Sequence, residues 1–159
     1  MRVAILSDTH DRLDRIRKAM ELIRRMKIKV GIHLGDFVSP FVVKELDFEK
    51  LYGVFGNNDG DRDMLRKKFQ EKGWDVDKGP RVIELENRKI LLMHEPHMLD
   101  AFVESGMFRI ILYGHTHRLE VKKGKPMIIN PGELAGWTSK RSSFVVLELS
   151  NLEYEVIYL

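Results

Sequence analysis

The 159-residue sequence contains no cysteine, which excludes disulfides and thiolate metal sites. A transition metal bound to this chain would have to use oxygen atoms of Asp, Glu or Asn and nitrogen atoms of His. No apolar run is long enough to span a bilayer, which takes roughly 20 residues in a helix. Residues 1–8 turn acidic too soon for a signal peptide and are typical of a first strand, so we expect a cytoplasmic protein without a membrane partner.

The chain has no large excess of charge of either sign. It contains 27 Lys and Arg and 24 Asp and Glu, which gives a formal net charge of +3. That balance is compatible with anionic substrates but is too weak to indicate nucleic-acid binding. Apolar residues make up 43% of the chain and charged residues 32%, which is typical of a folded globular protein. We therefore expect one domain over residues 1–159.

The first half of the chain alternates apolar runs with amphipathic segments. Apolar runs at 3–6, 30–34 and 51–55 are predicted to be buried strands. Helices are predicted at 11–27, from the Ser39-Pro40 start signal, and at 61–72 before Gly73. Strands and helices in this order imply parallel strands joined by right-handed crossovers.

The second half is predicted to be richer in hairpins, at 81–85 with 89–93, at 120–123 with 127–129, and at 143–149 with 153–158. A short helix is expected at 98–105 and another buried strand at 109–113. The predicted fold class is therefore α/β, a four-layer α-β-β-α sandwich in which two mixed sheets are flanked by helices.

Asp, Asn and His residues, which can bind metals, stand immediately after five of the predicted strands. In α/β sheets, ligands bind at the carboxyl ends of the strands. Taken singly, each motif could instead be a helix cap or a polar turn, and we expect Asp59 and Asp61 to be such residues. The joint pattern favours a metal site, and these donors suit Mn²⁺, Fe²⁺, Ni²⁺ or Zn²⁺. The candidates are Asp8, His10, Asp36, Asn57, His94, His115 and His117.

The ordered series D-x-H, G-D, G-N-x-D, a lone His and G-H-x-H resembles that of the calcineurin-like metallophosphoesterases over nearly the whole chain. The small size and the segment 129–132 resemble its compact prokaryotic phosphodiesterase branch, which shares its fold with the small retromer subunit of eukaryotes. The resemblance implies a first metal held by Asp8, His10, Asp36 and His117, and a second held by Asp36, Asn57, His94 and His115.

The function implied is hydrolysis of phosphate diesters by a hydroxide that bridges two divalent metal ions, Mn²⁺ being favoured over Ni²⁺, Fe²⁺ or Zn²⁺. A small phosphodiester substrate and a homodimer are the partners that the resemblance implies. The expected catalytic residues are Asp36, Asn57, Asn58 and His94, and the expected substrate contacts are Asn58, His97 and Arg118.

Asn58 stands where many members of the family have a His that protonates the leaving group. An amide donates a hydrogen bond but no proton, so we expect slow hydrolysis of alkyl esters and faster hydrolysis of aryl esters. This disfavours the first alternative, a phosphomonoesterase. The second alternative is a protein-binding scaffold of the same fold, and the seven intact ligand positions argue against it. The third is a nuclease. It is disfavoured because no basic patch interleaved with aromatic residues lies near the motifs.

The remaining residues singled out by the sequence are not expected to bind metal or take part in the reaction. Glu95 replaces a Gly that is usual in this branch and is expected to narrow the mouth of the site or repel substrate, whereas Glu133 replaces a frequent Ser and receives no role. His33 is expected to be a partly buried core residue, and Phe37 and Phe41 to fill the core near the site.

Overall fold

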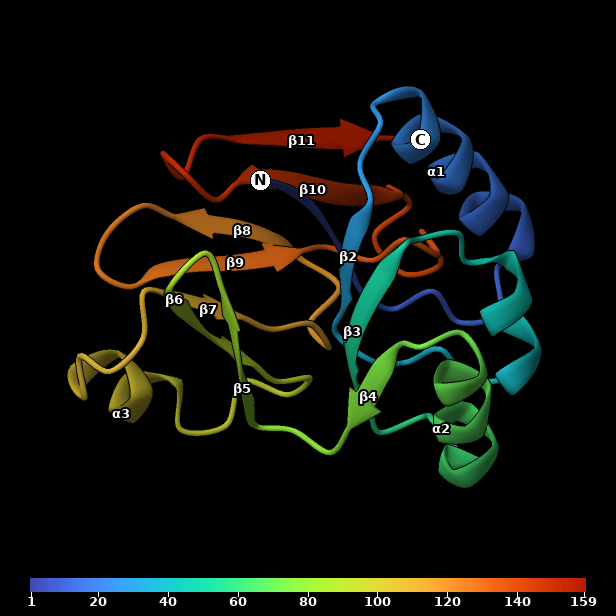
Figure 1. The fold of residues 1–159 in the computed structure, drawn as a ribbon, viewed down its shortest axis with the longest axis horizontal. Helices are drawn as coiled ribbons and strands as arrows, with labels where there is room; N and C mark the ends of the chain where they lie inside the picture. The colour runs from blue at the N-terminus through green and yellow to red at the C-terminus, as the bar shows by residue number, and fades with distance from the viewer.

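The computed structural model describes residues 1–159 and consists of two mixed β-sheets packed face to face, with helices outside them (Figure 1). The first sheet has the strand order β11 (Tyr154–Tyr158), β10 (Ser143–Glu148), β1 (Arg2–Leu6), β2 (Val30–His33), β3 (Lys50–Val54) and β4 (Asp75–Asp77). The second has the order β5 (Arg81–Leu85), β6 (Arg88–Leu92), β7 (Ile110–Leu112), β9 (Met127–Pro131) and β8 (Leu119–Lys122).

Both sheets are parallel in the middle and antiparallel at one or both edges. Strands β1 to β4 are parallel, as are β6, β7 and β9, whereas the hairpins β10–β11, β5–β6 and β8–β9 are antiparallel. The predicted parallel pairing of the first strands and all three predicted hairpins are therefore confirmed. Four-layer packing is confirmed as well, although the outer layer on the second sheet is a single short helix.

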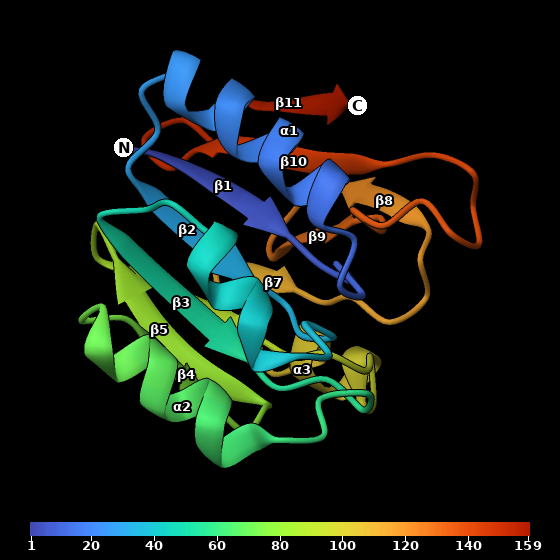
Figure 2. The same cartoon turned by 90° about the vertical axis from the view of Figure 1, so that its right-hand side faces the viewer.

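Three helical segments cover the outer face of the six-stranded sheet, and one covers the five-stranded sheet (Figure 2). The first three are α1 (Leu13–Arg25), the 3₁₀ helix η1 (Pro40–Glu45) and α2 (Arg62–Glu71), and the last is α3 (Leu99–Glu104). Ser39 and Asp61 cap η1 and α2 by accepting hydrogen bonds from backbone N–H groups. No helix combines the length and the apolar character that a membrane span requires.

Alternation along the central strands explains why their sequences are wholly apolar. Val3 and Ile5 of β1 point between the sheets, whereas Ala4 and Leu6 point toward α1, because successive side chains of a strand face opposite ways. The cluster under the helices of the first sheet has 21 buried residues and the cluster between the sheets has 15. Both faces of β1 are thus covered, which fixes its position in the fold.

The structure corrects three expectations. Strand β4 was not predicted, because its sequence Asp75-Val76-Asp77 has one apolar residue and is held by pairing with β3. Phe41 does not fill the core but is 78% exposed, since the 3₁₀ turn directs it outward, while Phe37 is fully buried. His33 is fully rather than partly buried; its ring stacks on Phe37 and lies 3.2 Å from the Thr9 hydroxyl.

The fold brings the ends of two sets of parallel strands to one side of the molecule. Strands β1, β2 and β3 of the first sheet and β6 and β7 of the second end there. The loops after β1, β3 and β7 can be followed beyond the arrowheads in Figure 2. Every candidate metal-binding residue lies in one of these loops.

Candidate metal centre

The backbone turns sharply at most of the candidate ligands. Non-glycine residues rarely adopt the left-handed conformation, and such residues concentrate at functional sites. Gly56 precedes Asn57 because a Cβ there would lie 2.1 Å from Oδ1 of Asp36, so only glycine allows the two loops to approach. The ligands with positive φ are Asp8, His10, Asp36, His115 and His117.

Asp36 lies at the middle of the cluster, with an imidazole on either side. Its Oδ2 is 3.3 Å from Nε2 of His10 and 3.5 Å from Nε2 of His94. These two rings come from loops after β1 and β6, which belong to different sheets. A carboxylate in this position can share its oxygen atoms between two cations.

On one side of Asp36, Asp8 joins His10 to His117. Its Oδ1 lies 3.6 Å from Nε2 of His10 and 3.2 Å from Nε2 of His117. Its Oδ2 accepts hydrogen bonds from the Ser7 hydroxyl at 2.5 Å and from the His115 backbone N–H at 3.1 Å. The protein therefore holds one oxygen of Asp8 and directs the other into the cluster.

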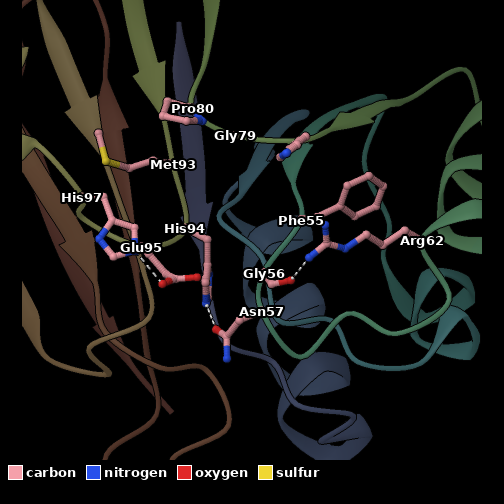
Figure 3. A pocket seen from close by; sticks show the side chains of 11 residues that line it. Phe55, Gly56, Asn57, Arg62, Gly79, Pro80, Met93, His94, Glu95 and His97 are labelled. Atoms are coloured by element: carbon pink, nitrogen blue, oxygen red, sulfur yellow. Dashed lines mark hydrogen bonds and ion pairs between the residues drawn. The ribbon is translucent and has the colours of Figure 1, made fainter.

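On the other side of Asp36, Asn57 joins His94 to His115, and Figure 3 shows its contact with His94. Its Oδ1 lies 3.0 Å from Nε2 of His94 and 3.0 Å from Nδ1 of His115. Nδ1 of His94 lies 2.6 Å from the carbonyl oxygen of Leu34, which can only accept, so Nδ1 carries the proton. Once Nε2 is deprotonated, its lone pair faces Oδ1 of Asn57 and the cluster, so both atoms could bind the same cation.

Two buried atoms of the cluster lack a hydrogen-bond partner, namely Oδ1 of Asp8 and Nε2 of His10. Buried polar atoms are nearly always paired, so two orphans side by side are typical of a site that binds something else. Ligand atoms of Asp8, His10 and His117 lie within 4.8 Å of one another, as do those of Asp8, Asp36 and His94. The residues present therefore fit a divalent cation, and Asp8 lies within reach of both groups.

The charges of the cluster also favour a cation. Burial alone would raise the pKa values of Asp8 and Asp36, but the close imidazoles of His10 and of His117 or His94 outweigh it and hold both below their usual range. The carboxylates of Asp36 and Asp8, 3.3 and 3.6 Å from its Nε2, raise the pKa of His10 to about 10. Two ionised carboxylates thus hold a proton on this imidazole, in a place where a metal ion could substitute for it.

A carboxylate missed by the sequence reasoning supports the cluster from outside. Glu133 is fully buried, and its Oε2 lies 3.1 Å from Nδ1 of His117. It also accepts hydrogen bonds from the backbone N–H groups of Trp137, Thr138 and Ser139. The only sequence signal was a Glu in place of Ser after Pro131-Gly132, and nothing in the sequence connects that position with His117.

The three expected substrate contacts, Asn58, His97 and Arg118, lie around the cluster. Asn58 donates from both its backbone N–H and its Nδ2 to Asp36, each at 2.8 Å, so its amide is engaged with a ligand. His97 is exposed and hydrogen-bonded to Glu95 at 2.8 Å. Arg118 is exposed and lines a separate hollow beside His115.

A family model described as the calcineurin-like phosphoesterase superfamily domain matches residues 1–152. The chain belongs to this superfamily. Membership implies a divalent metal site and a phosphoesterase reaction, and the nitrogen and oxygen donors described above fit such a site.

Relatives within the calcineurin-like phosphoesterase superfamily cover the whole chain. Phosphodiesterase MJ0936 of Methanocaldococcus jannaschii is 34% identical over 171 residues, covering 100% of this chain and 99% of that protein. The solved structure of a novel archaeal phosphodiesterase superposes with a TM-score of 0.93 at 32% identity, with both chains fully covered. Vacuolar protein sorting 29 of Cryptosporidium parvum shares the fold, with a TM-score of 0.70 at 21% identity over 99% of this chain and 96% of its own.

Proposed function

We propose that this protein is a phosphodiesterase that hydrolyses small phosphate diesters at a centre of two divalent metal ions. The observation that carries the proposal is the place of Asp36, whose Oδ2 lies between Nε2 of His10 and Nε2 of His94. The names of its full-length relatives support the diester as substrate. By its resemblance to this branch we also propose a cytoplasmic homodimer.

In the proposed centre, Asp36 is the ligand that the two metal ions share. Bound there, the metal ions would neutralise the charge of a phosphate and lower the pKa of a water molecule toward neutrality. We favour Mn²⁺ because carboxylate and amide oxygens stand beside the imidazoles. The first ion would be held by Asp8, His10, Asp36 and His117, and the second by Asp36, Asn57, His94 and His115.

The protein's own groups would keep these ligands in place and in the right protonation state. Asn58 would orient Asp36 through two hydrogen bonds, and the Leu34 carbonyl would keep the proton of His94 on Nδ1. The side chain of Asn58 cannot transfer a proton to the leaving group at neutral pH. Hydrolysis would therefore be fastest for esters whose leaving group is stable as an anion, such as aryl esters.

A metal-reconstituted assay tests this function. After loading with Mn²⁺, we expect faster turnover of bis-p-nitrophenyl phosphate than of p-nitrophenyl phosphate, and no turnover of either by Asp36→Ala. Glu84→Ala, an exposed acid on β5 remote from the ligands, is the matched control and should retain activity. Faster turnover of the monoester would favour a phosphomonoesterase, and substantial activity of Asp36→Ala would refute the bridging assignment.

A further inference from the structure

A pocket of about 160 Å³ opens beside the proposed metal centre and shares Asn57 and His94 with it (Figure 3). Its walls are formed by the turn after β3, the connection from β4 to β5 and the turn after β6. One water molecule takes up about 30 Å³ in the liquid, so this volume is enough for a group the size of a phosphate. A group bound here would adjoin a phosphate held by the ligand cluster.

The pocket is positively charged on balance. Arg62 and Lys78 line it, and neither takes part in an ion pair within 4 Å, whereas the nearby Arg66 is paired with Asp77. The one acid in the lining, Glu95, is engaged by His97, whose Nε2 lies 2.8 Å from its Oε2.

Arg62 is held in place by neutral groups, which leave its positive charge uncompensated. Its Nε and Nη2 donate to the backbone carbonyl oxygens of Asp59 at 3.2 Å and of Gly56 at 2.9 Å, and its guanidinium lies 5.5 Å from the centre of the Phe55 ring. Carbonyl groups are neutral, and a guanidinium has further N–H donors to offer. An ordered arginine also loses little side-chain freedom when it binds an anion.

We propose that this pocket binds a second phosphate group, carried on one ester arm of the diester that is hydrolysed at the metal centre. The inference rests on the proposed phosphodiesterase function and names its substrate class. A phosphate monoester carries a charge of about −1.5 to −2 near pH 7, and Arg62 and Lys78 offer it two cations that no acid pairs with. The resulting charge-assisted hydrogen bonds are roughly twice as strong as neutral ones, so the second phosphate would select among diesters.

Three synthetic diesters test the proposal, each with a p-nitrophenyl leaving group and with a propyl, 3-carboxypropyl or 3-phosphonopropyl second arm. The variant is Lys78→Gln, because Arg62 also holds the backbone next to Asn57. Lys67→Gln on the exposed side of α2 removes the same charge outside the pocket and is the matched control. Release of p-nitrophenolate gives kcat/KM for each pair of enzyme and substrate.

We expect the wild type to prefer the phosphonopropyl over the propyl diester by about tenfold or more in kcat/KM, as for one hydrogen bond to a charged group. That ratio should fall about tenfold in Lys78→Gln and stay unchanged in Lys67→Gln. Equal rates on the propyl and phosphonopropyl diesters would overturn the proposal, as would an equal loss in both variants. A stronger preference for the carboxypropyl arm would overturn the assignment of a phosphate.

Failure of the proposed function has a different signature, since none of the three diesters would then be hydrolysed. The pocket is in that case tested by calorimetric titration of the metal-free protein with inorganic phosphate. We expect Lys78→Gln, but not Lys67→Gln, to weaken phosphate binding about tenfold. Equal affinities of the wild type and Lys78→Gln would reject the pocket independently of any activity.

Discussion

Glu133 Oε2 lies 3.1 Å from Nδ1 of His117, so a buried carboxylate outside the cluster faces the ring whose Nε2 points to Asp8. The same carboxylate binds the backbone of residues 137–139. A carboxylate behind a metal-binding imidazole fixes the tautomer and the ring orientation. The loop and the ligand are therefore positioned by one side chain.

We predict that Glu133→Ser weakens metal binding, because His117 loses the carboxylate beside Nδ1 and keeps only the Thr138 hydroxyl, 3.1 Å from that atom. Loss of such an outer partner typically costs about 10–100-fold in metal affinity. Competition of Mn²⁺ with a fluorescent chelator measures the affinity. Glu133→Gln retains a carbonyl acceptor and should fall between Glu133→Ser and the wild type, whereas equal affinities of all three proteins would show that Glu133 only orders the loop.

Metal removal should destabilise the protein as well as inactivate it. A ligand present at 100 times its dissociation constant stabilises the folded state by about 2.7 kcal/mol. For a domain of this size we expect EDTA to lower the Tm by about 5–10 °C from that of the Mn²⁺-loaded protein. Asp36→Ala should show no such shift on adding Mn²⁺, and scanning calorimetry would reveal a retained shift if Asp36 were dispensable.

Replacing Asn58 should change which esters are hydrolysed. Asn58→His supplies a side chain that can protonate a leaving oxygen, an effect worth up to about 10²–10⁴-fold on poor leaving groups. It also removes the amide that donates to Oδ2 of Asp36, so aryl diesters should gain less or lose activity. The measurement is the slope of log kcat/KM against the pKa of the leaving group, and an unchanged slope in Asn58→His would contradict the prediction.

His33 makes the stability of the metal-free protein depend on pH. Burial, which favours the neutral ring, lowers its pKa to about 3 from an ordinary 6.5. The unfolded chain binds this proton below pH 6.5 and the folded chain does not, so the contribution is complete above pH 6.5 and is lost as the pH falls toward 3. The slope from this group is about 1.4 kcal/mol per pH unit in the free energy of unfolding.

Urea denaturation of the metal-free protein at pH 7 and pH 5 measures this dependence. His10, His94 and His117 have raised pKa values and contribute with the opposite sign, so the wild type must be compared with His33→Gln. We expect the difference in unfolding free energy between the two proteins to shrink at pH 5. A difference that is independent of pH would show that His33 does not titrate on unfolding.

The regular elements were predictable because their signals are local. Period-2 and period-3.6 patterns of apolar residues, with Ser39, Asp61 and Gly73 at helix ends, reproduce nearly every strand and helix. Strand β4 escaped prediction because edge pairing with β3, rather than its own residues, makes it extended. Phe41 was misplaced because the pattern cannot tell which way a short 3₁₀ turn directs its side chains.

The sequence by itself determined the metal-binding chemistry of this protein and its family, since the identities of the donors and their place after strands are written in the chain. Only the tertiary structure decided how these residues act on one another, because the contacts join segments far apart in sequence. Asn58 binds Asp36 across 22 positions, and Glu133 reaches His117 from the end of another strand. The charge of the neighbouring pocket likewise depends on which of its cations find a carboxylate, and that is settled by packing.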